Sequence, residues 1–223
     1  MSDPFTREDR EALCAAAAAI ATSGLVVGSS GNLSLRREGH VLVTPRRARL
    51  AAIDPVDCVC VALADGAVDA GHASDAEPSS ETGLHRQVYG AVPGAGAVVH
   101  THSHFATVLG TVVDEVPALH YVAATFGGAV RVARYATFGS QELADEVTRA
   151  LEGRSAALMA NHGAVATGRT IEHAVEQAEQ LEWLASVYWH ARALGAPTIL
   201  GDAQLAEVVE QSRSLRYGFT EDG

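Results

Sequence analysis

Apolar residues return along the chain at two spacings, and each spacing predicts a different kind of element. Leu84, Val88 and Val92 are four residues apart, as on one face of a helix, so we expect a helix over residues 81–92. Cap residues and similar spacings predict further helices. These are the alanine-rich segment after Thr6, residues 105–109, the segment after Ser140, and residues 171–194 and 205–215.

Shorter apolar runs, bounded by turn residues, predict strands. Residues 33–35 and 41–43 should form a hairpin. The other expected strands are residues 56–63, 97–102, 130–132 and 156–160. Helices and strands alternate irregularly, without a steady βαβ rhythm, so the pattern predicts an α/β fold with three layers, α/β/α, around a central, mainly antiparallel sheet.

Composition narrows the possible functions. The chain has 223 residues, 48% of them hydrophobic, and no linker or repeat divides it, so we expect a single domain over residues 1–223. A formal charge of −11 disfavours nucleic acid as a partner, and no apolar run approaches the ~20 residues that a membrane span needs. Three cysteines, two of them in an apolar run, fit the reducing cytoplasm.

Histidines give the strongest chemical signal. His100 and His102 alternate along an expected strand, so both imidazoles face the same way and could hold one cation. Such a pair alone is more often solvated than metal-bound. Glu81 and His162 make metal binding the better interpretation, because each lies at the end of another expected element and could supply a further ligand. Three neutral imidazoles and one displaceable carboxylate form a plausible zinc set.

Small polar residues in two segments suggest an anion site. Residues 28–32 are a turn whose backbone N–H groups could converge on an anion, although a plain turn is the commoner interpretation. Ser79 and Ser80 could equally be helix caps, with Glu81 complementing the helix dipole. Their position favours function, because one helix start would present both a phosphate site and a metal-binding carboxylate.

Six short motifs occur together, in one order along the chain. They are Gly31-Asn32-Leu33-Ser34, Pro78-Ser79-Ser80-Glu81, His100-Thr101-His102-Ser103, Leu119-His120-Tyr121, Tyr135-Ala136-Thr137-Phe138-Gly139 and Asn161-His162-Gly163. In this order and spacing the chain resembles the class II aldolase/adducin family over nearly its whole length. Within the family it looks most like the L-fuculose-1-phosphate aldolases, because Glu81 stands where the related 4-epimerases carry Asp.

The resemblance implies a set of ligands. His100, His102, His162 and Glu81 would hold one Zn²⁺ per subunit. The phosphate of the substrate would be bound by Gly31, Asn32, Ser79 and Ser80. The family's Thr-Pro-Thr-Gly loop is replaced here by Thr44-Pro45-Arg46-Arg47. Either Arg46 and Arg47 bring charge to the phosphate, or their side chains face solvent and only the backbone contributes.

The implied reaction is the reversible cleavage of a deoxyketose 1-phosphate, such as L-fuculose 1-phosphate, into dihydroxyacetone phosphate and an aldehyde such as L-lactaldehyde. Glu81 would move the proton at C3. Tyr121, reaching in from a neighbouring subunit, would exchange a proton with the aldehyde oxygen. Phe138 and Tyr217 would shape the aldehyde pocket. The family resemblance also implies a homotetramer with its active sites at the subunit interfaces.

Other functions fit the same site residues. Within the superfamily they are a pentulose-phosphate 4-epimerase, a methylthioribulose-phosphate dehydratase and a sugar-acid-phosphate decarboxylase. Adducin-like interaction domains lose metal ligands, whereas all ligand positions are filled here. Of the remaining histidines, we expect His85 to be exposed or to make a capping contact, His104 not to be a ligand, and His120 to orient Tyr121 or pack in the core.

Overall fold

Eight strands form one sheet in a computed structural model of the chain, which describes residues 3–71 and 74–215. Their order across the sheet is β3-β2-β1-β4-β8-β7-β6-β5. Neighbours run antiparallel except β6 and β7, which are parallel. The strands are β1 (Asn32–Arg37), β2 (His40–Val43), β3 (Val59–Ala62), β4 (Ala97–Thr101), β5 (Glu115–Val116), β6 (Val130–Ala133), β7 (Ala156–Met159) and β8 (Gly163–Gly168).

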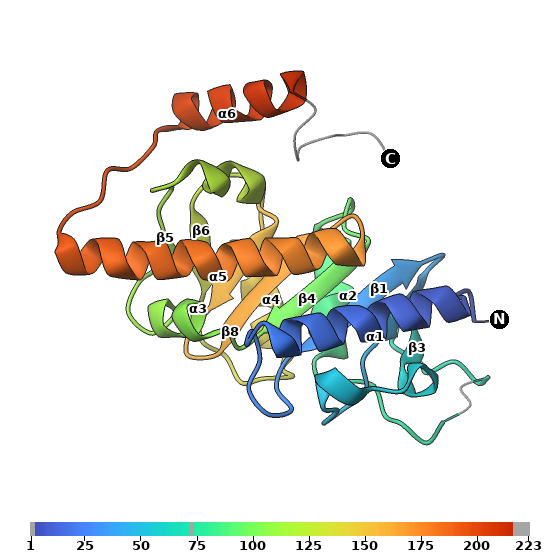
Figure 1. The fold of residues 1–223 in the computed structure, drawn as a ribbon. Coiled ribbons are helices and arrows are strands. Elements are labelled where there is room, and N and C mark those ends of the chain that lie inside the picture. The colour runs from blue at the N-terminus through green and yellow to red at the C-terminus, as the bar shows by residue number, and fades with distance from the viewer. Residues whose placement is uncertain (1–2, 72–73, 216–223) are drawn as a thin grey trace.

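Helices cover both faces of this sheet (Figure 1). One face carries α1 (Arg7–Thr22), α3 (His104–Leu109) and the long α5 (Ile171–Leu194), and the opposite face carries α2 (Thr82–Ala91) and α4 (Gln141–Ala150). Three short 3₁₀ segments, η1 (Leu50–Ala52), η2 (Pro55–Asp57) and η3 (Tyr121–Phe126), lie in the connections. The predicted α/β/α architecture with a mainly antiparallel sheet is therefore confirmed.

The layers follow from alternation of apolar side chains along the strands. On β4, Val98 packs into the core under α2 and α4, whereas its neighbour Val99 packs into the core under α1 and α5. Both side chains are fully buried. The expected cysteine packing is also observed, because Cys58 and Cys60 are buried in the second of these cores. The sheet thus separates two apolar cores.

Sequence patterns located most elements well. Helix α5 has the predicted bounds, and α4 begins after Ser140, whose hydroxyl accepts a hydrogen bond from the Leu143 N–H at 3.1 Å. Strand β8 was missed. Its segment, Gly-Ala-Val-Ala-Thr-Gly, is buried on both sides and shows no alternation, and its terminal glycines read as turn residues.

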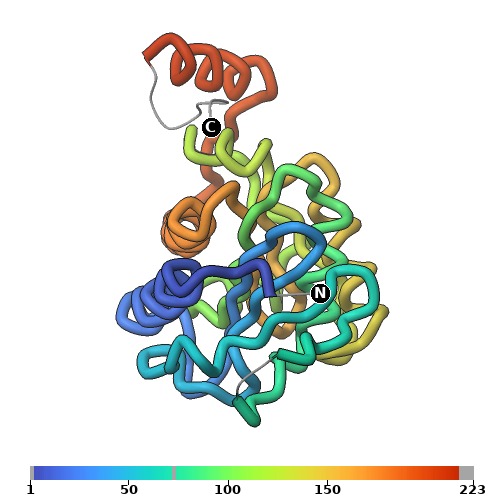
Figure 2. Tube along the Cα trace, turned by 90° about the vertical axis from the view of Figure 1, so that its right-hand side faces the viewer, coloured from blue at the N-terminus to red at the C-terminus, as the bar shows by residue number. Residues whose placement is uncertain are grey.

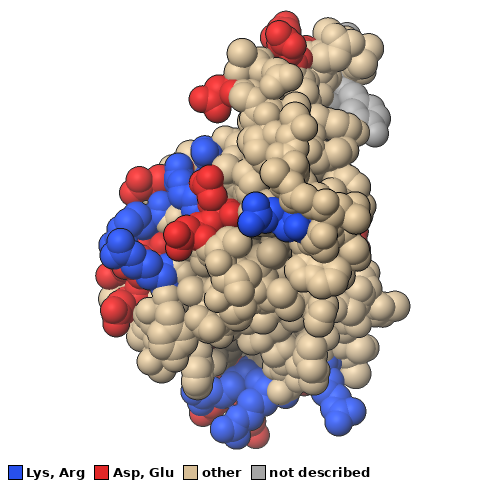
Figure 3. All heavy atoms as spheres, turned by 90° about the vertical axis from the view of Figure 1, so that its left-hand side faces the viewer, with Lys and Arg blue, Asp and Glu red and all other residues tan. Residues whose placement is uncertain are grey.

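The carboxyl-terminal helix α6 (Asp202–Ser214) stands apart from the three layers (Figure 2). It contacts η3, and the Leu200 N–H just before it donates to the Ala118 carbonyl oxygen at 2.9 Å. On the face seen in Figure 3, most charged side chains gather along the left edge and at the foot, with one basic group near the middle and acidic groups at the top, and the broad area between them is uncharged. Among the described residues, no helix is long and apolar enough to cross a bilayer.

Candidate active site

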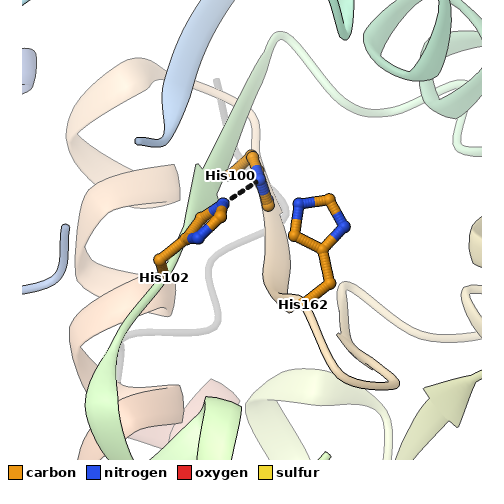
Figure 4. A group of neighbouring side chains, drawn as sticks. All are labelled: His100, His102 and His162. Atoms are coloured by element: carbon orange, nitrogen blue, oxygen red, sulfur yellow. Dashed lines mark hydrogen bonds between the residues drawn. The ribbon is translucent and has the colours of Figure 1, made fainter. Parts of the chain in front are cut away.

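The three predicted histidine ligands meet at one end of the sheet (Figure 4). His100 is on β4, His102 follows the end of that strand, and His162 lies in the turn between β7 and β8. Pairing of β4 with β8 brings the turn beside His100. Gly163 permits this close approach, because a Cβ at that position would lie 2.1 Å from the Thr101 carbonyl oxygen.

The three rings form a compact triangle. Each pair of ring centroids is 4.9 Å apart, and the ring planes lie at 66° to 81° to one another. One ligand nitrogen from each ring lies within 4.8 Å of the other two, and the Nε2 atoms of His100 and His102 are 3.0 Å apart. Three imidazoles with converging nitrogens supply three of the four ligands of a tetrahedral metal site and leave the fourth position open.

A hydrogen bond outside the triangle sets the tautomer of His100. Its Nδ1–H donates to the Ala164 carbonyl oxygen at 2.9 Å. The lone pair of the neutral ring therefore lies on Nε2, which faces His102 and Glu81. Metal-bound histidines commonly have such a backbone partner, because it fixes the ring and keeps the ligand nitrogen basic.

Glu81 closes the open side of the triangle. It is buried just before α2, and its Oε2 lies 3.2 Å from His100 Nε2 and accepts a hydrogen bond from Asn32 Nδ2 at 3.0 Å. Its Oε1 lies 3.5 Å from His162 Nε2, and within the described part of the chain it accepts no hydrogen bond. A buried carboxylate oxygen without a donor is costly, and a cation there would satisfy it. The residues present therefore fit a zinc ion.

Burial and neighbouring charges set the protonation of this cluster. Burial, together with the charges of the nearby His100 and His162, lowers the pKa of His102 to about 4. Burial likewise lowers the pKa of His162. For Glu81, burial acts to raise the pKa, but the charge and hydrogen bond of His100 and the Asn32 amide outweigh it, so the pKa is lowered. Burial acts to lower the pKa of His100, but the charge and hydrogen bond of Glu81 outweigh it, so this pKa is raised. A divalent cation at the site would take the place of the proton that His100 and Glu81 share.

A cavity of about 630 Å³ opens in front of the cluster. The size suits a small phosphorylated metabolite. Three of the metal-ligand candidates line it: Glu81, His102 and His162. The predicted substrate-binding residues that line it are Gly31, Asn32, Arg46, Arg47, Ser79, Ser80 and Phe138.

Two of these residues, Gly31 and Arg47, adopt the left-handed backbone conformation. Gly31 has a φ of +79°, and a Cβ there would lie 2.9 Å from the His100 carbonyl oxygen, so only glycine lets this turn lie against β4. Arg47 has a φ of +57° where the resembled loop has glycine, so it keeps the left-handed backbone and adds a charged side chain. Arg46 pairs with Glu77 at 2.8 Å, whereas the described residues give Arg47 no ion-pair partner.

Tyr121 lies away from this cavity. Tyr121 is 55% exposed and lines a separate cavity with Leu200 and Val208, beside α6. A role for Tyr121 in catalysis thus requires a site on another copy of the chain. Tyr217 lies outside the described residues. His104 is exposed at the start of α3, and His120 stacks on Tyr121 with ring centroids 4.4 Å apart.

The prediction for His85 was wrong, because its side chain is fully buried on α2. Its ring bonds to Asn32 and Ser34, so a helical spacing from Glu81 concealed an inward-facing polar residue. Sequence reasoning also left out Tyr135 and Asn161, which line the cavity. Asn161 has a φ of +55°, and asparagine directly after a buried strand is a signal for this conformation.

Comparisons with known proteins agree with this geometry. A 5-methylthioribulose-1-phosphate/5-deoxyribulose-1-phosphate aldolase from Rhodospirillum rubrum is 38% identical over 94% of this chain and 92% of its own. An L-fuculose phosphate aldolase from Escherichia coli K12 is 34% identical over 87% of this chain and 88% of its own.

A solved L-fuculose 1-phosphate aldolase superposes with a TM-score of 0.88 at 32% identity, covering 94% of this chain and 98% of that one. The sequence profile of the Class II Aldolase and Adducin N-terminal domain matches residues 11–189, which include every candidate metal ligand. The chain therefore belongs to the class II aldolase and adducin family.

Proposed function

We propose that the protein is a zinc-dependent aldolase of the cytoplasm that reversibly cleaves the C3–C4 bond of a deoxyketose 1-phosphate. The products are dihydroxyacetone phosphate and a short aldehyde. The observation that carries the proposal is the arrangement of His100, His102, His162 and Glu81, with its unpaired Oε1, at the wall of a metabolite-sized cavity. An adducin-like role in interaction would have no use for this cluster.

The cluster answers the main chemical difficulty of the reaction. Breaking the C3–C4 bond leaves negative charge on the dihydroxyacetone phosphate portion, which a poorly hydrated pocket cannot tolerate without a counter-charge. Bound Zn²⁺ would supply a Lewis acid that stabilises this charge. His100, His102 and His162 would hold the ion, and Glu81 would complete the site in the resting enzyme.

The chain's own residues would bind and orient the substrate. The turn at Gly31 and the segment Ser79-Ser80 offer backbone and hydroxyl groups to the phosphate. Arg47 adds a positive charge at the same cavity, while Arg46 is held by Glu77. Asn32 faces Glu81 through its amide nitrogen, so its side chain supports the carboxylate as well as lining the cavity.

Two residues would move protons. The Glu81 carboxylate would exchange the proton at C3, because Glu81 lines the cavity and its Oε1 accepts no hydrogen bond within the described part of the chain. Tyr121 of a neighbouring copy would exchange a proton with the oxygen on C4, since a phenol can donate while neutral. Phe138, 67% exposed at the cavity, would contact the aldehyde portion, as would Tyr217.

The preferred substrate in this proposal is 5-deoxyribulose 1-phosphate or its 5-methylthio analogue. The greater identity to the Rhodospirillum rubrum enzyme supports this choice. L-Fuculose 1-phosphate is the second candidate, supported by the TM-score of 0.88 to an aldolase for that sugar. Both reactions release dihydroxyacetone phosphate, so the catalytic residues would act in the same way on either.

Release of dihydroxyacetone phosphate, measured with a coupled dehydrogenase, tests the proposal. Zinc-loaded protein is offered 5-deoxyribulose 1-phosphate, 5-methylthioribulose 1-phosphate and L-fuculose 1-phosphate, and kcat/KM ranks them. We expect cleavage of at least one, lost on chelation and restored by zinc. No cleavage of any of them would refute the aldolase assignment. Product analysis then distinguishes epimerised, dehydrated and decarboxylated products of the alternative activities.

A further inference from the structure

A continuous line of polar side chains runs through the core between β1 and α2 and ends at Glu81. We call these five residues the relay: Tyr89, Ser34, His85, Asn32 and Glu81. Every member is at most 6% exposed. Tyr89 belongs to the apolar core under α2 and α4, and in such surroundings a buried polar atom depends on its neighbour in the relay for a hydrogen bond.

The contacts of the relay are short. The Tyr89 hydroxyl lies 2.8 Å from Ser34 Oγ and 3.0 Å from the Ser34 carbonyl oxygen. Ser34 Oγ lies 2.6 Å from His85 Nδ1, and His85 Nε2 lies 2.5 Å from Asn32 Oδ1. Asn32 Nδ2 then reaches Glu81 Oε2 at 3.0 Å. Ser34 and Asn32 alternate on β1, while His85 and Tyr89 are one turn apart on α2.

The direction of every hydrogen bond follows from the last one. An ionised Glu81 can only accept, so Asn32 donates through Nδ2 and its Oδ1 faces His85. Oδ1 can only accept, so His85 carries its proton on Nε2. The ring is fully buried and, among the described residues, bonds only to the uncharged side chains of Asn32 and Ser34, an environment that favours the neutral form, so its Nδ1 accepts from Ser34 Oγ. One arrangement of protons satisfies the contacts from Ser34 Oγ to Glu81, and the single Tyr89 hydroxyl proton can then go to Ser34 Oγ or to the Ser34 carbonyl oxygen.

We propose that His85 is a positioning residue that, as the neutral Nε2–H tautomer, fixes the Asn32 amide so that its nitrogen holds Glu81 Oε2 and leaves Oε1 toward the metal site. This inference rests on the proposed function, because it deepens the role of Glu81. Without the His85 donor, only the Glu81 carboxylate itself orients the Asn32 amide; with it, the ring also holds Oδ1 on the side away from Glu81 and so keeps Nδ2 toward the carboxylate. The flipped amide would place Oδ1 against the carboxylate and repel it.

The tautomer itself is the first test, and it needs no substrate. Nitrogen-15 NMR of ¹⁵N-histidine-labelled protein, with the His85 signal identified by its absence from His85→Gln, reports which ring nitrogen carries the proton. We expect a neutral ring protonated on Nε2 from pH 5 to 8, with or without zinc. A ring protonated on Nδ1, or a charged ring, overturns the proposal even where the enzyme is active.

Kinetics of two His85 variants give the second test. In His85→Gln the amide can still donate to Asn32, whereas His85→Leu has a similar volume and no donor. We expect His85→Leu to lower kcat by about 10- to 100-fold with little change in KM, at equal zinc content, and His85→Gln to recover most of it. Equal losses of kcat in both variants would show that His85 only fills space.

A packing control comes from the same helix. Val88→Ala removes buried volume from α2 away from the relay, and should lower the melting temperature while leaving kcat within about threefold. A second variant keeps the test valid if His85→Leu does not fold. Ser34→Ala removes the donor to His85 Nδ1, so a mixture of both His85 tautomers with a lowered kcat would support the proposal, and an unchanged His85 NMR spectrum would overturn it. Wild-type protein that cleaves no ketose phosphate but shows the Nε2–H tautomer would overturn the proposed function alone.

Discussion

His100 uses both of its ring nitrogens, and this determines what its neighbours can do. Its Nδ1–H is held by the Ala164 carbonyl oxygen, so Nε2 remains for a ligand role. His102 and His162, with lowered pKa values, add two more neutral nitrogens from different parts of the chain. A site whose ligands come from three separate backbone segments should lose affinity sharply when one ligand is removed.

His162→Ala should therefore empty the metal site. His162 lies in a turn, so the fold should persist, and we expect zinc to fall from one per subunit to well below a tenth at equal total zinc. Metal content by mass spectrometry, with circular dichroism as the check on folding, measures this. His104→Ala is the matched control, because this exposed residue continues the same motif and should leave the zinc content unchanged.

Arg47 offers a prediction about substrate affinity. Arg47→Gly keeps the left-handed backbone but removes the charge, so KM for the sugar phosphate should rise by about 10-fold with kcat nearly constant. Arg46→Ala should change KM by less than about threefold, because its exposed side chain is already paired with Glu77. Steady-state kinetics gives the KM of both variants, and equal increases in KM would contradict a special role for Arg47 in phosphate binding.

His85 makes stability depend on pH. Its pKa is about 3 in the folded protein and near 6.5 in the unfolded chain, so between these values only the unfolded chain binds the proton. The free energy of unfolding should thus fall as pH falls from 6.5. Between pH 7 and pH 5 the metal-free wild type should lose about 2 kcal/mol more than His85→Gln. Urea melts at fixed protein concentration measure the difference, and parallel losses would refute it.

Residue types in short motifs predicted the metal-ligand candidates, because a strand's alternation places His100 and His102 on one side whatever the rest of the fold does. The same reasoning could not find the role of His85. Its position is set by contact with β1, which lies about fifty residues earlier in the chain, and helical spacing alone does not show whether a polar residue faces the sheet or solvent.

Elements bring these residues together, and β8 is the decisive one. It pairs with β4 along Thr101↔Ala164 and thereby sets His162 beside His100. The approach leaves no room for a side chain at Gly163. The sequence does not predict β8, because a buried segment of small residues shows no alternation of apolar and polar positions. Its two neighbours in the sheet, β4 and β7, are both predicted.

Gly163→Ala should push β8 from β4 and disturb the site. We expect a loss of at least about 2 kcal/mol in the free energy of unfolding and a marked loss of zinc affinity. Gly90→Ala is the matched change, because it lies in α2 with open space around it, and it should stabilise by roughly 0.5–1 kcal/mol. Denaturant melts and zinc titrations compare the two, and similar behaviour would contradict the close-approach argument.

At the scale of the whole molecule, Tyr121 and the histidine cluster belong to different surfaces. Tyr121 is exposed beside the projecting α6, and the face in Figure 3 has a broad uncharged area reaching toward that helix. Such a surface suits contact with another copy of the chain. The homotetramer implied by the family resemblance remains a prediction, as does the single domain.

Mixing two inactive variants tests whether sites are shared. Tyr121→Phe should lower kcat by about 100-fold, and His162→Ala should be inactive. If each site combines the histidines of one copy with Tyr121 of its neighbour, unfolding and refolding the variants together should restore roughly a quarter of wild-type activity in a ring. Light scattering reports the assembly state. No recovery in a mixed oligomer would place Tyr121 outside the chemistry.

The cavity is built from two kinds of structure, and this has a consequence for how the protein can change. Its metal-binding wall comes from strand ends and the turn at His162, tied into the buried cores. Another part of the lining comes from residues 44–47 and 135–139, whose larger side chains are mostly exposed. Mutations in residues 135–139 can alter which aldehyde portion fits, and mutations in residues 44–47 can alter phosphate binding, without touching the groups that break the bond. Specificity and chemistry are therefore free to evolve separately in this protein.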